Sequence, residues 1–439
     1  MQMSHQTVTP PPASDDGSRS SSSNTATVEA PPPAKKPRAE AGPHTKHTPT
    51  PLSSPLTLSP DAMPTSNALL TARLKREIKK IWAAERSASA SATSLTDTVR
   101  NSSGNIASLI PPFKVGTTEM YRRFPQAYDL LMHHHNCSAL QTVLLRDIIG
   151  RIESAAARAV STEENAQPQP PWIRVADFGC GTGRIEAMAA QHRAVQAIYA
   201  YDNEVAMLQQ CLLNTVRSAA RSQHYRGVSL SPAATTIPSP SSSSSAPLPS
   251  IEICAEDSGR CDTATTAKEG AVGRDTPAML QLCVRPVPFQ AIQDGFLAAT
   301  HHPRCSLMVC AWSLSYVMRM QWGEDHWHAA VDAVVEAMIH RLDTRASDAA
   351  IVIVETLGNG SAEPTRQNTY TQRLEDHFGF TRTWVRTDYE FATKADAERM
   401  VRFFFGGKML SRLTMDPDGV KWRLMECTGI WTLWKTRQQ

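Results

Sequence analysis

The stretch Val175–Arg184, VADFGCGTGR, decides the fold of this chain. An apolar run (WIRVA) leads into it and predicts a buried strand that ends at Asp177. Glycines then recur at alternate positions before the helix-compatible sequence IEAMAAQH: Gly179, Gly181 and Gly183. Glycine lets the backbone turn sharply and lets a ligand lie against bare main chain, near the amides of a helix N-terminus. The sequence therefore predicts a strand, a tight turn and a helix that together bind a ligand.

The spacing of these glycines indicates which ligand it is. A dinucleotide-binding turn has the spacing G-x-G-x-x-G, which would require a glycine where Arg184 stands. The chain instead has an acidic residue followed by three glycines at alternate positions, from Asp177 to Gly183. A second apolar run, AIYAYD, predicts a neighbouring strand that ends in a carboxylate, Asp202. A carboxylate at that place can accept hydrogen bonds from both hydroxyl groups of a ribose.

Together these features resemble the first motif of the class I S-adenosylmethionine (SAM) methyltransferases. The resemblance implies SAM as the cofactor, with the glycine turn against its methionine half and Asp177 helping to hold its ammonium group. It also implies a doubly wound α/β fold with a seven-stranded sheet. The strings AWSLSYV, ETLGNG, RFFFGG and ECTGIW add a resemblance to an uncharacterised branch of the same family, and the match covers most of residues 121–434.

Composition limits the classes of function. The net charge of the 439 residues is only +3, so the chain lacks the basic footprint of a dedicated nucleic-acid binder, although this does not exclude RNA. Nine cysteines are scattered without a C-x-x-C pair, and no histidine pair has zinc spacing, so we expect reduced thiols and no metal site. The sequence has neither an apolar run long enough to span a membrane nor an N-terminal apolar signal segment. We expect a cytoplasmic protein, with the nucleus as the alternative, and no membrane contact.

The chain divides into three parts by composition. Residues 1–65 are rich in Ser, Thr, Pro and Ala and are predicted to be disordered, and a basic cluster at Lys35 to Arg38 is either a nuclear-localisation signal or a solvated patch. Residues 66–105 are predicted to form an amphipathic helix and a linker. The methyltransferase domain is expected over 106–439, interrupted by a low-complexity insertion at about 216–278. The tail and the insertion are places where a partner protein could bind.

The insertion obscures the third strand of the sheet. Either SIEICAED or MLQLCVRPV, which starts at Met279, fits, and position favours the second, although it lacks the acidic residue that the family usually places near the adenine. The fourth strand is expected to end near Ala311 and the fifth at Glu355, where a glycine-containing loop follows. Alternation then predicts a strand over 379–391, a helix over 392–413 and a last strand ending at Trp434.

Candidate site residues follow from the rule that ligands bind beyond the carboxyl ends of the strands. Ala311 and Trp312 are expected beside the cofactor. Glu355 is either a general base or a carboxylate that holds the loop after it. Tyr121, on a helix before the glycine turn, is a candidate lid residue, and Asp388 either serves the acceptor side or forms an ion pair with Arg386.

The predicted reaction is transfer of a methyl group from SAM to a small molecule. No N/D-P-P-Y string follows the fourth strand, which speaks against methylation of the exocyclic amine of adenine or of glutamine and leaves O-, other N-, S- and C-methylation open. Two alternatives remain: a nuclear enzyme acting on RNA or protein, and an accessory subunit that binds SAM without catalysis.

Overall fold

The computed structural model describes residues 67–90, 110, 115–161, 172–222, 224–230, 251–254, 278–298, 302–320, 326–345, 348–365 and 368–436. All of these belong to one compact unit, Pro64–Gln439. The predicted disordered tail, its basic cluster, the linker after the first helix and most of the predicted insertion lie outside the described residues. Among the described helices, none has both the length and the apolar character needed to cross a membrane.

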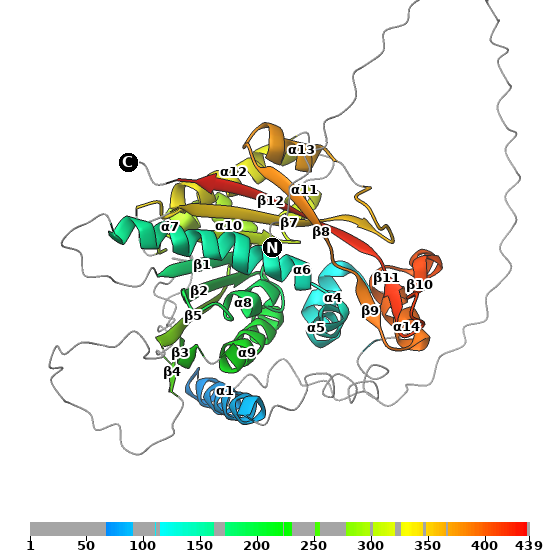
Figure 1. Cartoon of the computed structure of the whole chain (residues 1–439), viewed down its shortest axis with the longest axis horizontal. Coiled ribbons are helices and arrows are strands. Elements are labelled where there is room, and N and C mark those ends of the chain that lie inside the picture. Colours follow the sequence, from blue (N-terminus) through cyan, green and yellow to red (C-terminus); the bar gives the residue numbers. More distant parts are fainter. Residues whose placement is uncertain are drawn as a thin grey trace, which may run out of the picture. The chain divides into compact units, whose positions relative to one another are not determined.

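A nine-stranded sheet forms the centre of the unit, in the order β4-β3-β5-β2-β1-β6-β7-β12-β8 (Figure 1). Neighbouring strands run parallel from β3 to β7, whereas β12 is antiparallel to both of its neighbours and β4 is antiparallel to β3. The strands, in chain order, are β1 Ile173–Phe178, β2 Val195–Asp202, β3 Tyr225–Leu230, β4 Ile251–Cys254, β5 Ala278–Pro286, β6 Leu307–Ala311, β7 Ala349–Asn359, β8 Thr381–Arg386 and β12 Glu426–Lys435. The expected doubly wound α/β sheet with an antiparallel strand near one edge is confirmed.

Two edge strands make the sheet larger than the seven strands predicted. The preferred candidate for the third strand is correct, because β5 pairs with β2. The other candidate, SIEICAED, contributes the short edge strand β4. Between them lies β3, Tyr225–Leu230, inside the region predicted to be an insertion, and the helix before it continues to Ser222. The boundary of about 216 was therefore wrong, since this segment pairs in parallel with β5 and is largely buried.

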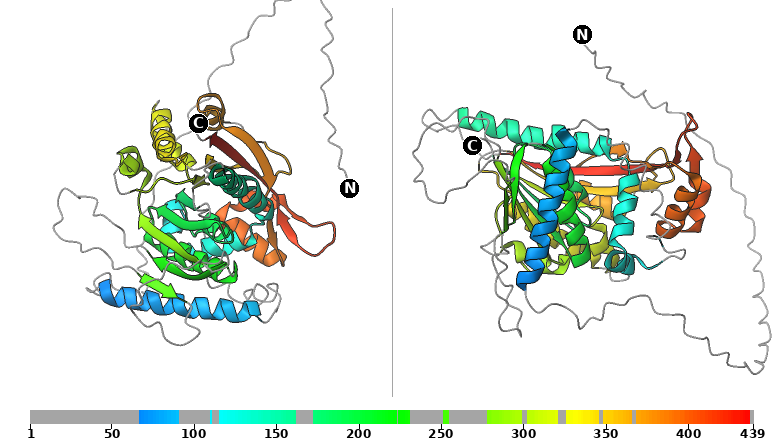
Figure 2. Two further views of the ribbon diagram at one scale, coloured as in Figure 1. Left: turned by 60° about the vertical axis from the view of Figure 1, so that its left-hand side comes forward. Right: turned by 90° about the horizontal axis from the view of Figure 1, so that it is seen from below.

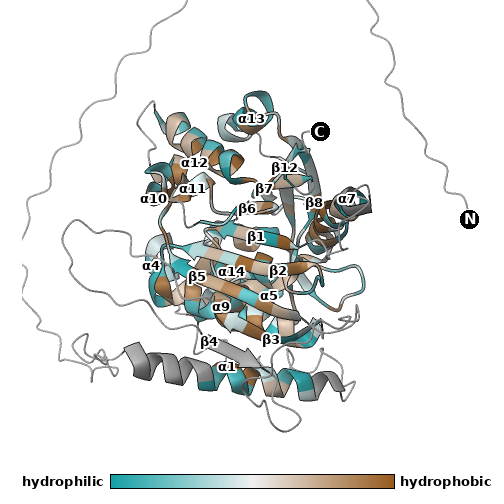
Figure 3. Cartoon of the chain, turned by 90° about the vertical axis from the view of Figure 1, so that its left-hand side faces the viewer, coloured by the Kyte–Doolittle hydropathy of each residue, from teal (hydrophilic) through white to brown (hydrophobic). Residues whose placement is uncertain are grey.

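Alternate residues of the central strands face two separate layers of helices. Val175 and Val309 pack with one layer, whereas Ala176 and Met308 pack with the other. The first layer contains α6 Ser138–Thr142, the π-helix η3 Val143–Ile149, α7 Gly150–Ser161, α8 Arg184–Ala189 and α9 Val205–Ser222. The second contains α10 Phe289–Gln293, η4 Phe296–Ala298, α11 Ser315–Met320, α12 Trp327–Arg341 and α13 Thr369–Asp376. Figure 3 shows brown, hydrophobic segments along the strands between helices that carry both colours.

The first described helix, α1 Asn67–Ala90, lies alongside α9 (Figures 1 and 2). Ile78 and Trp82 are buried in the first layer, as the predicted amphipathic pattern requires. An ion pair between Glu85 and Arg221, with Nε 2.7 Å from Oε2, ties the helix to α9. Within this unit, the helix docks on the folded domain.

A small second sheet forms where the sequence predicted one strand and one long helix. Its strands are β9 Tyr389–Phe391, β10 Leu413–Met415 and β11 Trp422–Leu424, in the order β10-β11-β9. The predicted strand over 379–391 is split, because β8 pairs with β12 as far as Arg386 and the chain then leaves for the second sheet. The predicted helix over 392–413 ends early, as α14 Lys394–Phe404 followed by η5 Gly407–Arg412, since Gly406 has a positive φ of 88°. This sheet packs with α4 Thr117–Arg123 and α5 Pro125–His134.

Candidate functional site

The glycine turn follows β1, and its geometry requires glycine at each of the three predicted positions. Gly179, Gly181 and Gly183 have φ angles of 76°, 56° and 86°. A Cβ on Gly179 would lie 2.3 Å from Cβ of Ser313, and one on Gly183 would lie 2.7 Å from Cα of Cys211. The turn is therefore wedged between the loop after β6 and α9, with no room for a side chain at either contact.

Asp202, at the end of β2, is bonded to the turn. Its Oδ2 accepts a hydrogen bond of 2.9 Å from the Gly181 amide, and its Oδ1 accepts one of 2.9 Å from the Glu204 amide. Burial is the main cause that raises the pKa of this carboxyl above its ordinary value. The carboxylate thus fixes the turn and the strand end relative to each other.

A cavity of about 270 Å³ opens over this turn, and we call it the first cavity. It lies at the carboxyl ends of β1, β2 and β6, where a doubly wound sheet binds its ligands. The predicted residues that line it are Asp177, Gly179, Gly181, Asp202, Ala311, Trp312 and Tyr121. Gly183 instead supports the turn from behind, against Cys211.

Asp177 is the most deeply buried acidic residue of the first cavity, with 1% of its surface exposed. Burial, with a smaller contribution from the nearby Asp202 carboxylate, raises its pKa to about 8. A cationic group placed in the cavity would oppose both effects and favour the ionised form. The first cavity therefore has the electrostatics of a site for a ligand that carries positive charge.

A second cavity of about 310 Å³ adjoins the first. The two share a wall, and its residues line both cavities: Tyr121, Tyr128, Met132, Trp312 and Tyr316. The hydroxyl groups of Tyr121 and Tyr316 lie 2.6 Å apart and join α4 to α11 across this wall. A ligand in either cavity would therefore lie against the same five side chains.

Trp312 holds an unusual backbone conformation in this shared wall. Its φ is 52°, the one positive value among the described non-glycine residues. The Trp312 amide donates a hydrogen bond of 2.6 Å to the Val354 carbonyl, across the end of the parallel strands. Strain of this kind persists where the surroundings enforce it, and it is concentrated at ligand sites.

Glu355 lines the second cavity and is bonded at the same time to α11. One oxygen, Oε1, accepts hydrogen bonds from the Ser315 amide at 2.9 Å and from the Tyr370 hydroxyl at 3.4 Å. Burial raises the pKa of Glu355 to about 7. The carboxylate thus anchors the first residue of α11, not the segment that follows Glu355, and still borders the cavity.

The predicted end of the fifth strand at Glu355 is wrong. Strand β7 continues to Asn359, because β12 pairs with it beyond the point where β6 stops. The parallel pairing of β6 with β7 ends at Val354. Glu355 therefore still lies at the carboxyl edge of the parallel sheet, although no loop begins there.

The structure does not bring Asp388 to either cavity lining. Its carboxylate pairs with the Arg386 guanidinium, at 2.6 Å from Nη2 to Oδ2, and accepts a hydrogen bond of 2.9 Å from the Glu426 amide. Arg423 lies 3.5 Å from the same carboxylate. Asp388 therefore forms the ion pair with Arg386 that was the predicted alternative to a role on the acceptor side.

Sequence reasoning missed much of the second cavity. His135 is buried, because α5 ends at His134 and the imidazole ring of His135 stacks on Tyr389 with centroids 4.3 Å apart. Burial lowers the pKa of His135 well below its ordinary value. The other lining residues that were not predicted come from several distant segments and include Arg319, Asn359, Tyr370, Phe404 and Phe405.

No protein-family model matches this sequence, and no curated protein matches it. Solved structures similar to the chain include a precorrin-6y C5,15-methyltransferase from Geobacter metallireducens (TM-score 0.27, 11% identity, 63% of this chain and 87% of that one). Others are a SAM-dependent methyltransferase from Geobacter sulfurreducens with S-adenosyl-L-homocysteine (0.27, 10%, 68% and 98%) and the plantazolicin methyltransferase BpumL with the same ligand (0.26, 8%, 78% and 99%). At TM-scores this low, the function has to be inferred from the cavities of the chain.

Proposed function

We propose that this protein is a SAM-dependent methyltransferase that acts on a small molecule. The observation that carries the proposal is the pair of adjoining cavities with a shared aromatic wall. One cavity has the glycine turn, a buried carboxylate and a half-buried one, and the other has a single buried carboxylate with a raised pKa. A methyl donor and its acceptor need two such compartments in contact.

The residues of the first cavity fit SAM. The bare main chain at Gly179 and Gly181 provides the close approach that the methionine half needs, because a side chain at Gly179 would collide with Ser313. Asp202 would accept from the ribose hydroxyls, and Asp177 would face the ammonium group. Apolar side chains of Val287, Phe289 and Ile292 line the part of the cavity beyond β5 and would flank the adenine in place of an acidic contact.

Glu355 would act as the general base. SAM supplies an activated methyl group, so the protein has to align the acceptor and remove its proton. A carboxylate with a pKa of about 7 is half ionised near neutral pH and is matched to that task. As the acceptor atom attacks the methyl carbon, its proton would pass to Glu355. The aromatic wall of the second cavity would hold the acceptor and exclude water.

The second cavity supports a small molecule over a macromolecule. Its volume of about 310 Å³ lies at the lower end of the range for small-molecule sites, and its lining combines aromatic and uncharged polar side chains, with Arg319 and Glu355 as the charged members. An RNA substrate would require a basic surface, whereas the net charge is +3. The placement of Glu355 beside the shared wall favours turnover over SAM binding alone. All seven described cysteines are free, which agrees with a reducing compartment such as the cytoplasm or nucleus.

Titration calorimetry with SAM, followed by incubation of the protein with methyl-labelled SAM and a metabolite extract, tests this function. We expect SAM to bind and one or more small products to gain the label. Failure to bind SAM would contradict the proposal as a whole. Binding without any labelled small product, together with label in added RNA or protein, would support the macromolecular alternative instead.

A further inference from the structure

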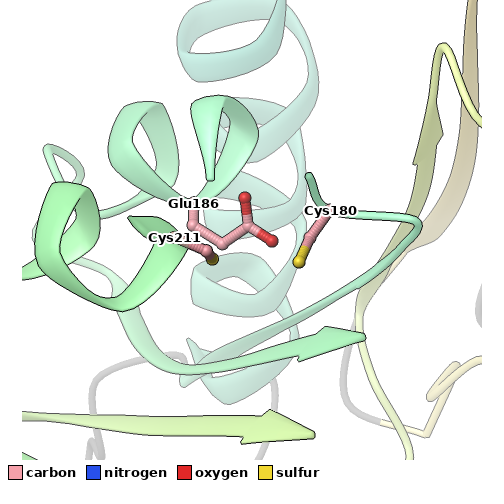
Figure 4. Close-up of side chains that lie close together, drawn as sticks. All are labelled: Cys180, Glu186 and Cys211. Carbon is pink, nitrogen blue, oxygen red and sulfur yellow. The ribbon is translucent and has the colours of Figure 1, made fainter. Parts of the chain in front are cut away.

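Three buried side chains meet directly behind the glycine turn: Cys180, Glu186 and Cys211 (Figure 4). They come from three different elements, since Cys180 is in the turn, Glu186 is on α8 and Cys211 is on α9. Their two sulfur atoms and one carboxylate oxygen all lie within 4.8 Å of one another. In Figure 4 the Glu186 carboxylate lies between the two cysteines.

The Glu186 carboxylate is adjacent to the Asp177 carboxyl and has no basic side chain as a partner among the described residues. Its side chain is completely buried, and neither of its oxygens accepts a hydrogen bond within the part of the chain that the structure describes. No ion pair to it is found there either. The adjacent Asp177 adds a further buried oxygen, Oδ1, that lacks a partner. Burying a carboxylate without compensation is costly, so this cluster either shares a proton between the Glu186 and Asp177 carboxyls or holds a cation.

We propose that Cys180, Cys211 and Glu186 bind a zinc ion. Zinc takes Cys sulfur at about 2.3 Å and carboxylate oxygen at about 2.0–2.2 Å, so tetrahedral ligand atoms lie roughly 3.5–3.8 Å apart. Ligand atoms within 4.8 Å of one another reach that spacing with shifts of about 1 Å at most. Thiolate ligands select zinc over magnesium or calcium.

Binding forms two Zn–S bonds and one Zn–O bond and releases to solvent the two thiol protons and any proton that the Glu186 carboxyl holds, with no change of oxidation state. The fourth position is left to water. The ligands at 180, 186 and 211 show none of the usual zinc spacings because the fold, not a local motif, brings them together.

The ion would join the turn, α8 and α9 beneath the first cavity. Cys180 also lines that cavity, so metal binding and the geometry of the turn are linked. The site stands apart from the methyltransferase proposal, because a zinc ion here would be structural whatever ligand the cavity takes.

Zinc content of the full-length protein, purified without chelator, tests the site. We expect one zinc per chain in the wild type, and loss of that zinc in Cys211→Ser and in Glu186→Gln. Cys310→Ser is the matched control, because Cys310 is equally buried on β6 but outside the cluster, and it should keep the ion. Cobalt(II) added to the chelator-treated protein should give a thiolate charge-transfer band that Cys211→Ser lacks.

Thermal stability gives a readout that does not depend on any reaction. Zinc at 100 times its Kd should raise the Tm of the chelator-treated wild type by about 5 °C, and it should leave Cys211→Ser unchanged. Wild-type protein that contains no zinc, gains no stability from it and shows no cobalt band would overturn the site. Loss of the metal in Cys310→Ser as well would do so too, because binding would then not depend on the cluster.

Discussion

The first cavity places a glycine turn and two carboxylates among mainly apolar side chains, whereas the second mixes aromatic and polar side chains around one carboxylate. Three elements that follow one another in sequence, β1, α8 and β2, supply the turn and both acidic residues of the first cavity. The second draws on segments from Met120 to Phe405. The backbone of the glycine turn fits one ligand and tolerates little change, whereas a wall of side chains can be altered residue by residue to suit another acceptor. The cavity wall nearest the second sheet is thus where acceptor specificity would be determined.

The two cavities also differ in the kind of positive charge that their carboxylates are suited to accept. In the first, burial raises the pKa of Asp177 to about 8, and a cationic ligand would restore its ionised form. In the second, burial raises the pKa of Glu355 to about 7, which prepares it to take a proton. Mutations of the two carboxylates should therefore affect different steps.

The largest effect is expected for Glu355→Gln. Loss of a general base lowers turnover typically by about 100- to 10,000-fold, whereas SAM affinity should stay within a few-fold of wild type. Steady-state kinetics with the identified acceptor and calorimetry with SAM measure the two quantities. Asp388→Asn is the matched control, because Asp388 is buried to the same extent as Glu355, each with 8% of its surface exposed, and lines neither cavity. Normal turnover in Glu355→Gln would mean that Glu355 is not the base and that its role is to anchor α11.

The pH dependence of stability offers a second measurement on Glu355. Its folded pKa, about 7, lies above the ordinary value of 4.5, so the protonated form is the one that folding favours. The resulting stability is present below pH 4.5 and is lost as pH rises through 7, by about 3 kcal/mol at most. Glu355→Gln lacks this loss, so the mutant should gain stability relative to wild type between pH 5 and 8. Denaturant unfolding at pH 5 and at pH 8 measures the gain. A difference in unfolding free energy between the two proteins that does not change with pH would contradict the raised pKa.

Asp202→Ala should weaken SAM binding roughly 10- to 150-fold, because hydrogen bonds to a charged group contribute about 1.5–3 kcal/mol each. The structure adds a second route to this loss, since the carboxylate also holds the Gly181 amide. Asp294→Ala, on the exposed end of α10, should bind SAM like wild type. If Asp202→Ala bound SAM as tightly as the control, Asp202 would not hold a ribose in the first cavity.

A smaller effect is expected at the shared wall. Tyr121→Phe removes the hydroxyl that bonds Tyr316, a net loss of about 0.5–1.5 kcal/mol, so kcat/KM should fall roughly 2- to 10-fold. Tyr316→Phe breaks the same bond and should have the same effect. The double mutant should be no worse than either single mutant, because only one interaction is lost. Additive effects in this cycle would mean that the two hydroxyls contact ligands separately.

The sequence predicted the first cavity because its residues are local. The turn glycines and Asp202 follow two consecutive apolar strands, so their spacing alone brings them together. The second cavity could not be predicted in the same way, because His135 and Phe405 line one cavity only after the small sheet of β9, β10 and β11 has formed. That sheet was missed because its strands are three residues long, and β9 continues the alternation of β8 after a break of two residues. Strand β3 was missed because it lies next to a low-complexity segment.

Asp388→Asn is expected to leave turnover within about twofold of wild type, since a residue outside both cavities cannot take up the acceptor proton. Its carboxylate instead holds the chain where it passes from β8 to β9, through Arg386, Arg423 and the Glu426 amide. The Asn oxygen can still accept from that amide, so the loss is confined to the ion pairs. Because the Arg386 side chain is about a third exposed, solvent screening limits this loss to about 1–2 kcal/mol, which corresponds to a fall in Tm of about 2–8 °C. Arg386→Gln removes the same pair from the other side and should melt at a similar temperature. A large fall in turnover at an unchanged Tm would instead place Asp388 on the acceptor side.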